Sequence, residues 1–275
     1  MEARKIDLND FVHSGEGANG ESLNHRTDSS VMVKLYNAGT PVGKIEAELD
    51  FTRKVYSLGI PCPKPGEFVT DGEGRYGIKF QRIVGKKSFS RAVGENPDEV
   101  ERYARKFASM CRELHSTKVP SEGFVNVKDQ YRNILSKSTV YTPEERRYLE
   151  KAIAEAPDGD TAIHGDLQFS NAIIVGDEAY FIDLGDFSYG SPYFDLGMVL
   201  FTCMYDNPDF IRDVFHMEPD TARRFWHYFV KGYFGEDFDP DEAEHMLKPY
   251  AALKLLIIER DAKEALPWYH WLLKD

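Results

Sequence analysis

The residues of this chain best suited to chemistry lie between His164 and Asp183. Asp166 belongs to the His-Gly-Asp segment that begins at His164, Asn171 follows five residues later, and Asp183 precedes a Leu-Gly pair. A carboxylate can accept the proton of an attacking hydroxyl, and an amide oxygen with a second carboxylate can hold Mg²⁺ beside nucleotide phosphates. The pattern therefore predicts phosphoryl transfer.

Two short apolar runs, 172–175 and 179–182, flank a turn rich in glycine and acidic residues. They predict a β-hairpin with a three-residue turn. In such a hairpin Asn171 and Asp183 come at adjacent strand ends, and Asp166 lies in the loop that leads into it. We therefore expect a magnesium site at this end of the hairpin.

The composition limits the class of protein. The chain has 275 residues, of which 42% are hydrophobic and 29% charged, as in soluble globular proteins of one or two domains. It contains no apolar run of membrane-spanning length and no signal-peptide core, so we expect a cytoplasmic protein without a membrane partner. A net charge of −12 argues against a nucleic-acid partner, which needs a basic face. Nothing in the composition indicates an oligomeric state.

Three glycines near the N-terminus, Gly15, Gly17 and Gly20, fit the pattern G-x-G-x-x-G. Glycines at this spacing would let backbone amides approach a phosphate closely. An ordinary glycine turn between two strands explains the same residues. A dinucleotide-binding Rossmann unit is excluded, because no strong strand precedes the glycines and no helix pattern follows them.

The strand pattern at 31–36 contains Lys34 among apolar residues. A lysine in this position is costly unless its ammonium reaches an anion, although an edge-strand lysine is the alternative interpretation. The helix expected over 44–58 offers a counter-ion. Glu48 shares a helix face with apolar residues at +3 and +7 and points inward, whereas Glu46 shares its face with charged residues.

The pattern changes from strands to helices near residue 86. Strand-like segments occur at 67–70 and 76–83, and helical spacing dominates afterwards. We expect an N-terminal nucleotide-binding lobe over 1–84 and a helical C-terminal lobe over 85–275, with a hinge at about 81–86. The sequence thus predicts an α+β fold: a small lobe with an antiparallel sheet and one helix, and a larger, mostly helical lobe across a cleft.

Further elements are expected in the C-terminal lobe. The patterns predict helices over 96–115, from 143 onward, 192–205, 219–233 and 241–261, and a short strand over 161–163. His115 is interpreted as a packed structural histidine. The aromatic segment 266–273 has two interpretations, a cage for a quaternary ammonium group or core packing of a terminal helix.

These motifs together resemble the aminoglycoside phosphotransferase and choline kinase family, whose fold is similar to that of protein kinases. His164-Gly165-Asp166 with Asn171 resembles the family's H-G-D-x-x-x-x-N motif. Other resembling segments occur in the family's order along nearly the whole chain: Gly59–Pro63, Arg112–His115, Ile182–Gly185 and Pro192–Gly197.

The resemblance implies roles for the residues of the catalytic loop and the hairpin. Asp166 would orient and deprotonate the acceptor, and Asn171 and Asp183 would hold Mg²⁺ on the β- and γ-phosphates. Asp195 would support the catalytic loop, together with His164.

The resemblance also implies a nucleotide site in the N-terminal lobe, for ATP or GTP. Lys34, paired with Glu48, would contact the α- and β-phosphates, beneath a loop formed by Gly15, Gly17 and Gly20. The hinge backbone from Gln81 to Ile83 would receive the purine. Ser22 stands where the family usually has valine, which is a departure in the phosphate loop.

The acceptor implied by the resemblance is a small molecule: an amino alcohol, a sugar, or an aminoglycoside-like compound. A Ser/Thr protein kinase is the first alternative. It is disfavoured because Gly165 stands where protein kinases carry arginine, and because only nine residues separate Gly185 from Asp195. A catalytically silent nucleotide-binding or scaffold module is the second alternative, against which the complete set of reactive residues argues.

Overall fold

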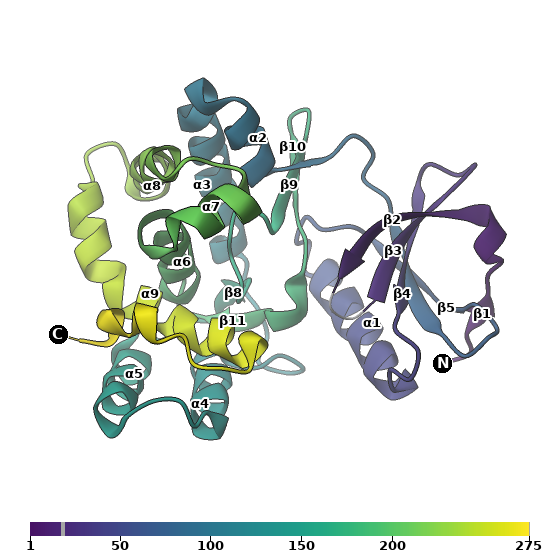
Figure 1. Cartoon of the computed structure of the whole chain (residues 1–275), viewed down its shortest axis with the longest axis horizontal. Coiled ribbons are helices and arrows are strands. Elements are labelled where there is room, and N and C mark those ends of the chain that lie inside the picture. The colour runs from purple at the N-terminus through teal and green to yellow at the C-terminus, as the bar shows by residue number, and fades with distance from the viewer. Residues whose placement is uncertain (18–19, 275) are drawn as a thin grey trace. The chain divides into compact units, whose positions relative to one another are not determined.

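A computed structural model describes residues 1–17 and 20–274, which form two compact units (Figure 1). The first unit comprises Met1–Lys87 together with Ile173–Gly185, and the second comprises Ser88–Ala172 and the chain from Asp186 onward. The segment that carries Asp183 therefore groups with the N-terminal part of the chain. The boundary at residue 84 remains a prediction.

The first unit is built on a six-stranded sheet in the order β1-β5-β6-β4-β3-β2, in which all pairings except β1 with β5 are antiparallel. The helix α1 packs against β5 and β6. The elements are β1 (Arg4–Lys5), η1 (Leu8–Asp10), β2 (Phe11–Gly17), β3 (Gly20–His25), β4 (Val31–Tyr36), α1 (Val42–Ser57), β5 (Pro65–Thr70) and β6 (Tyr76–Gln81).

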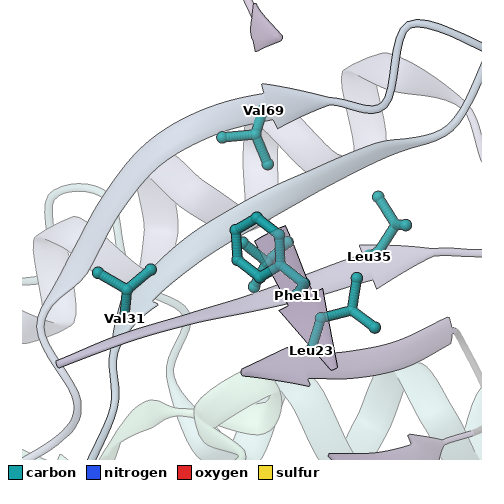
Figure 2. Close-up of a cluster of buried hydrophobic side chains, with 6 residues drawn as sticks. Phe11, Leu23, Val31, Leu35 and Val69 are labelled. Carbon is teal, nitrogen blue, oxygen red and sulfur yellow. The ribbon is translucent and has the colours of Figure 1, made fainter. Parts of the chain in front are cut away.

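The alternation of side chains along β4 creates two different faces. Val31, Val33 and Leu35 point into one buried cluster, in which they pack with Phe11, Leu23 and Val69 (Figure 2). Successive side chains of a strand point to opposite faces, so Lys34 and Tyr36 lie on the other side. That side is the one covered by α1, because Tyr36 packs in a second cluster with Ile45 and Leu49 of this helix.

The predicted hairpin is present, with a shorter turn. Strand β9 (Ala172–Val175) pairs with β10 (Glu178–Phe181), and β7 (Lys87–Ser88) is the third strand of this small sheet. The turn has two residues, Gly176 and Asp177. Gly176 adopts the left-handed conformation, with φ +56°, which a tight two-residue hairpin turn favours. The second strand therefore starts and ends one residue earlier than the sequence predicted.

The second unit is mostly helical. Its helices are α2 (Phe89–Glu95), η2 (Pro97–Glu99), α3 (Val100–Ser116), α4 (Val127–Lys137), α5 (Pro143–Glu155), α6 (Tyr193–Leu200), the π-helix η4 (Phe201–Tyr205), α7 (Pro208–Phe215), α8 (Pro219–Phe234), α9 (Pro240–Ala262) and η5 (Pro267–Leu273). Strands β8 (Thr161–Ile163) and β11 (Ser188–Gly190) form an antiparallel pair, and η3 (Leu184–Asp186) precedes β11.

Two helices, α3 and α9, organise the packing of this unit. The helix α3 packs along α8, and α9 packs along α6 while also contacting α4 and α5. The predicted helices over 96–115 and 192–205 each consist of two pieces, η2 with α3 and α6 with η4. The sequence patterns did not reveal α2, α4 or α7. No helix in the described ranges is long and apolar enough to cross a membrane.

The aromatic C-terminal segment forms the 3-10 helix η5 and divides into two sets of side chains. Tyr269, Leu272 and Leu273 are buried, as core packing predicts. Trp268 and Trp271 are 61% and 48% exposed. The buried side chains explain why the segment is apolar, and the cage stays a prediction.

Candidate active site

The catalytic loop from His164 to Asn171 alternates between buried and polar side chains. Leu167 and Phe169 are fully buried. The centre of the Phe169 ring lies 4.7 Å from that of Phe215 and 5.4 Å from that of Phe225. These two apolar anchors hold the loop in the core of the second unit. Asp166 and Gln168 alternate with these anchors in the sequence, and their side chains lie together, away from the core.

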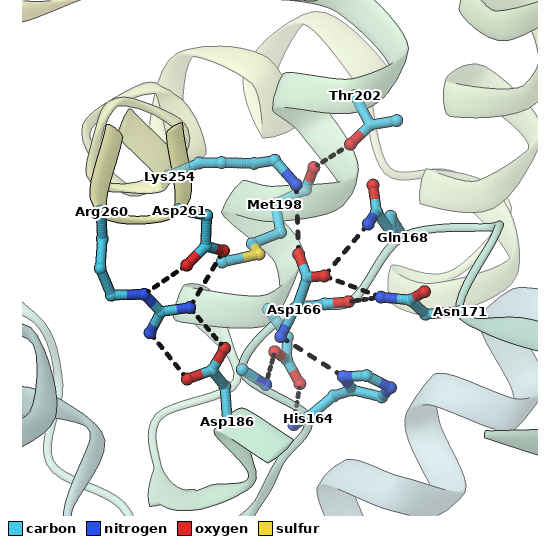
Figure 3. Close-up of polar contacts among 12 residues, drawn as sticks. His164, Asp166, Gln168, Asn171, Asp186, Met198, Thr202, Lys254, Arg260 and Asp261 are labelled. Atoms are coloured by element: carbon cyan, nitrogen blue, oxygen red, sulfur yellow. Dashed lines mark hydrogen bonds and ion pairs between the residues drawn. The ribbon is translucent and has the colours of Figure 1, made fainter. Parts of the chain in front are cut away.

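The Asp166 carboxylate is held by three donors (Figure 3). The Asn171 Nδ2 and the Gln168 Nε2 donate to Oδ2, at 2.8 and 3.1 Å. The Lys254 Nζ lies 3.4 Å from Oδ1. The Asp166 side chain is 23% exposed, so it is accessible and still fixed in direction.

The charge of Asp166 is stabilised by these neighbours. Burial alone would raise the pKa of its carboxyl group, but the positive charge of Lys254, the nearby His164 and the hydrogen bonds from Lys254 and Asn171 outweigh burial and lower it. Asp166 is therefore an ionised carboxylate at neutral pH, which is the form that accepts a proton.

Asp195 holds the backbone at the start of the loop. Its fully buried carboxylate accepts hydrogen bonds from the backbone N–H groups of His164, at 2.7 Å, and Gly165, at 2.9 Å. The His115 Nε2 lies 3.1 Å from the same carboxylate, and the His115 Nδ1 lies 2.8 Å from the Tyr233 hydroxyl. The structure thus brings His115, His164 and Asp195 together behind the catalytic loop.

Gly165 fills a position that no other residue fits. Its φ is +87°, and a Cβ atom would lie 2.1 Å from the backbone oxygen of Asp186. Real Cβ atoms do not approach a carbonyl oxygen this closely, so the loop and the segment at Asp186 pack backbone to backbone. The arginine of protein kinases cannot be accommodated in this arrangement.

The side chain of Asp186 lies in a second polar cluster that the sequence did not reveal. Arg260 of α9 makes a bidentate ion pair with its carboxylate, at 2.8 and 2.9 Å. Gln130 of α4 donates to the Asp186 Oδ1 and backbone oxygen, at 3.2 and 3.3 Å. This cluster ties α4 and α9 to the segment that packs against Gly165.

The side chains predicted to bind a metal have suitable donor atoms. The Asn171 Nδ2 donates to the backbone oxygen and the Oδ2 of Asp166, which leaves the Asn171 Oδ1 for a cation. Asp183 is exposed, with φ +60°. An amide oxygen and a carboxylate are hard ligands that suit Mg²⁺. Within the described residues no three His, Cys, Asp or Glu side chains converge, so phosphate oxygens and water would complete the coordination.

The first unit brings together a second polar group around Lys34. The Lys34 Nζ lies 2.7 Å from the Glu48 Oε1 and 5.0 Å from the centre of the Tyr36 ring. Burial raises the pKa of the Tyr36 hydroxyl, and the carboxylates of Glu48 and Asp183 raise it further. Glu46, which shares its helix face with charged residues, pairs at the surface with the N-terminal amino group of Met1.

The glycine segment lies in a hairpin of β2 and β3. Gly15 and Gly17 belong to β2 and Gly20 opens β3, while Ala18 and Asn19 lie outside the described residues. A Cβ atom at Gly20 would lie 2.2 Å from the backbone oxygen of Leu35, beside Lys34. Gly20 therefore allows the hairpin to approach the strand that carries the lysine.

The three backbone N–H groups of the predicted hinge, from Gln81 to Ile83, differ in whether they donate a hydrogen bond within the protein. The Gln81 N–H donates to the Lys64 oxygen at 2.9 Å, and the Arg82 N–H donates to the Ser30 oxygen at 2.7 Å. The Ile83 N–H has no acceptor among the described residues. Ile83 is therefore the better candidate donor to a purine.

Sequence reasoning missed Lys254 and Arg260, which both lie on α9. Lys254 interrupts the apolar run 251–258, and an isolated lysine among buried helix residues is a detectable signal. Its partner could not be deduced, because Asp166 is 88 residues away in the chain.

The chain belongs to the phosphotransferase enzyme family, whose sequence profile matches residues 16–227. The protein is therefore a phosphotransferase, and the family predicted from the motifs is confirmed. No curated protein matches the chain in a sequence search.

Solved structures that the chain resembles have low sequence identity. A thermostable mutant of aminoglycoside phosphotransferase APH(4)-Ia in its apo form is 12% identical with a TM-score of 0.65, over 96% of this chain and 92% of that chain. The streptomycin–ATP–APH(2")-IIa ternary complex is 18% identical with a TM-score of 0.57, over 92% and 86%. A choline/ethanolamine kinase family protein from Mesorhizobium loti is 15% identical with a TM-score of 0.54, over 92% and 80%. The predicted α+β, protein-kinase-like fold is confirmed.

Proposed function

We propose that the protein is an ATP- and Mg²⁺-dependent kinase that phosphorylates a hydroxyl group of a small molecule. The observation that carries the proposal is the Asp166 carboxylate, which is ionised, accessible and held by Gln168, Asn171 and Lys254. A fixed carboxylate in a phosphotransferase is suited to orient an attacking hydroxyl.

The reaction balances with the residues of this chain. The acceptor oxygen attacks the γ-phosphorus in line, an oxygen–phosphorus bond forms, and the bond from the γ-phosphorus to the bridging oxygen of ADP breaks. The hydroxyl proton passes to a carboxylate oxygen of Asp166, and the product is a phosphate monoester. Asp195 and Gly165 keep the loop in place during the step, because their contacts involve the loop backbone itself.

We assign nucleotide and metal binding to the residues that the motifs predict. Lys34, held by Glu48, would neutralise the α- and β-phosphates, and the Ile83 amide would receive the purine. Asn171 and Asp183 would hold Mg²⁺, which supplies charge neutralisation on the phosphates when it is bound. Their donor atoms fit this ion.

A small acceptor is favoured over a protein substrate by the segment that follows Asp183. β11 directly follows η3 and pairs with β8, and α6 begins at Tyr193. The segment between Gly185 and Asp195 is thus occupied by regular structure and has no room for a long activation loop. Similar solved structures support the same class, since they are complexes with hygromycin B, streptomycin and gentamicin.

A silent nucleotide-binding module is the competing function. Such a module would bind ATP equally with and without Mg²⁺, whereas the proposed kinase binds the Mg²⁺ complex. A thermal-shift titration with ATP in MgCl₂ and in EDTA separates the two. Equal shifts in both buffers, together with no phosphate transfer, would favour the silent module.

The direct test is incubation with γ-labelled ATP and MgCl₂ against a panel of amino alcohols, sugars, aminoglycosides and generic protein substrates. Label in a small molecule supports the proposal, and label in proteins alone would contradict it. Asp183→Ala should abolish the transfer while the far-UV spectrum is unchanged, because it removes a metal ligand. Asp177→Ala, in the turn of the same hairpin, is the matched control and should retain activity.

A further inference from the structure

Lys254 is a buried lysine on α9, and its burial requires an explanation. The residue is 5% exposed, and its neighbours along the helix, Leu253 and Leu255, are fully buried. Transferring an ammonium group from water to such surroundings is unfavourable unless an anion compensates. The anion that pairs with Lys254 therefore indicates the role of the residue.

That partner is Asp166. Within the described part of the chain, Asp166 Oδ1 is the sole hydrogen-bond acceptor of the Lys254 Nζ, at 3.4 Å. Two weaker interactions accompany it: the centre of the Phe201 ring lies 6.0 Å from the Nζ, and the carboxylate of Asp206 interacts with the ammonium through its charge. The buried ammonium of α9 thus makes its direct ion pair with the carboxylate of the catalytic loop.

The position of Lys254 is fixed by close packing of α9. A Cβ atom at Gly197 of α6 would lie 2.4 Å from the backbone carbon of Tyr250, so the two helices touch at their backbones one turn before Lys254. Arg260 holds the same helix further along through its bidentate pair with Asp186. With contacts on both sides of Lys254, α9 cannot shift without breaking one of them.

The two oxygens of Asp166 are held differently. Oδ2 accepts hydrogen bonds from two side-chain amides, whereas Oδ1 has a single, longer contact with Lys254. Oδ1 therefore retains a free lone pair and is the oxygen that can receive the proton of an acceptor hydroxyl. The ammonium prevents the carboxylate from rotating about the end held by the amides.

We propose that Lys254 is a positioning residue for phosphoryl transfer, which orients Asp166 so that Oδ1 faces the acceptor hydroxyl. This inference rests on the proposed function, because it assigns the direction of the base in that reaction. Lys254 acts through Asp166, so its contribution should vanish when the carboxylate is absent. A lysine that only stabilises the helix would contribute equally with and without Asp166.

A double-mutant cycle tests this difference. Wild type, Lys254→Met, Asp166→Asn and the double variant are compared by release of labelled phosphate from γ-labelled ATP in MgCl₂, with water as the acceptor, and by Mg-ATP affinity in calorimetry. Lys254→Met should lower kcat by about 10- to 100-fold, since a small misplacement of a catalytic group has effects of this size. ATP affinity should change less than about twofold.

The decisive readout is the double variant. It should release phosphate at the rate of Asp166→Asn alone, because both changes remove the same interaction between the carboxylate and the ammonium. Lys254→Arg should restore part of the rate lost in Lys254→Met, since it returns a cation near Oδ1. Lys248→Met, elsewhere on α9, is the control and should match wild type.

The failure of the inference can be told from the failure of the proposed function. A wild-type protein that releases no phosphate from Mg-ATP and labels no acceptor contradicts the kinase assignment itself. An active wild type with a wild-type-like Lys254→Met, or with multiplicative losses in the double variant, overturns the role of Lys254. Where Lys254→Met unfolds by circular dichroism, Lys254→Arg with and without Asp166→Asn completes the same cycle.

Discussion

The two units each contain a lysine paired with a carboxylate, and the pairs differ in burial and length. In the first unit Lys34 and Glu48 are 2.7 Å apart, with side chains 35% and 32% exposed. In the second unit Lys254 and Asp166 are 3.4 Å apart, with side chains 6% and 23% exposed. The shorter pair is the more solvated one, and the longer pair is enclosed by protein.

The difference shows why distance alone does not rank ion pairs. A partly exposed pair is screened by water and contributes at most about 1 kcal/mol to folding, whatever its length. In the second pair the ammonium is almost fully buried, so the orientation of the pair is set mainly by the protein. We therefore expect Lys34 to act mainly on ligand affinity and the Lys254–Asp166 pair mainly on the rate of the chemical step.

The largest expected effect is on the base itself. Asp166→Asn should lower kcat for the labelled acceptor by about 10²–10⁴-fold, because the amide cannot accept the hydroxyl proton as a carboxylate does. Its affinity for Mg-ATP in calorimetry should stay near that of wild type. Asp160→Asn, at an exposed position just before β8, is the control. A rate loss of less than tenfold would contradict the assignment of the base.

Gly165→Ala should destabilise the catalytic loop that carries Asp166, the carboxylate of the Lys254–Asp166 pair. The new Cβ would meet the Asp186 backbone at a φ of +87°, which should lower the free energy of unfolding by about 3 kcal/mol or more. Gly176→Ala is a matched control, since Gly176 has φ +56° and open space around it. It should cost about 1–2 kcal/mol. Equal losses for both variants in urea unfolding would show that Gly165 is not sterically constrained.

Lys34→Met should separate affinity from rate. Loss of a charged hydrogen bond to phosphate corresponds to roughly a tenfold or greater increase in KM for ATP. The urea midpoint should barely change, because the pair with Glu48 is about one-third exposed. Lys44→Met, on the exposed first turn of α1, should leave both quantities unchanged. A fall in kcat at unchanged KM would contradict the distinction between the two pairs.

The smallest effect concerns Asp206, the other carboxylate that Lys254 influences. Burial raises the pKa of Asp206 above 3.8, although the Tyr269 hydroxyl, 2.6 Å away, and the charge of Lys254 oppose the shift. Because the folded-state pKa exceeds the unfolded one, ionised Asp206 destabilises the fold above the folded pKa, and this cost disappears as the pH falls toward 3.8. Asp206→Asn should therefore gain stability relative to wild type as the pH rises.

Urea midpoints of both proteins from pH 4 to pH 8 measure this gain. A difference that does not vary with pH would show that Asp206 is not the group responsible. Asp209→Asn, whose side chain is 85% exposed, serves as the control for surface charge.

Much of the fold followed from local patterns in the sequence. The alternation of Val31, Val33 and Leu35 identified a strand. The helix predicted from 143 onward is present, and it begins with a capping box in which the Glu145 side chain accepts from the Thr142 N–H at 2.8 Å. These features depend on residues close together in the chain.

The parts that were missed depend on distant contacts. Lys254 and Arg260 acquire their meaning from Asp166 and Asp186, which lie 88 and 74 residues earlier in the chain. The π-helix η4 likewise follows α6 without a break in hydrophobicity that would mark it. The residue types of the catalytic loop could be identified from the sequence, but Lys254, which holds Asp166, comes from a distant helix.

The anchoring of α9 has a consequence for the order of events during protein synthesis. The catalytic loop is translated before α9, so a nascent chain that ends ahead of residue 254 has Asp166 without its ammonium partner and Asp186 without Arg260. Domains fold as their segments leave the ribosome, from the N-terminus onward. Such a chain would hold every residue of the catalytic loop and still lack a fixed base until α9 emerges.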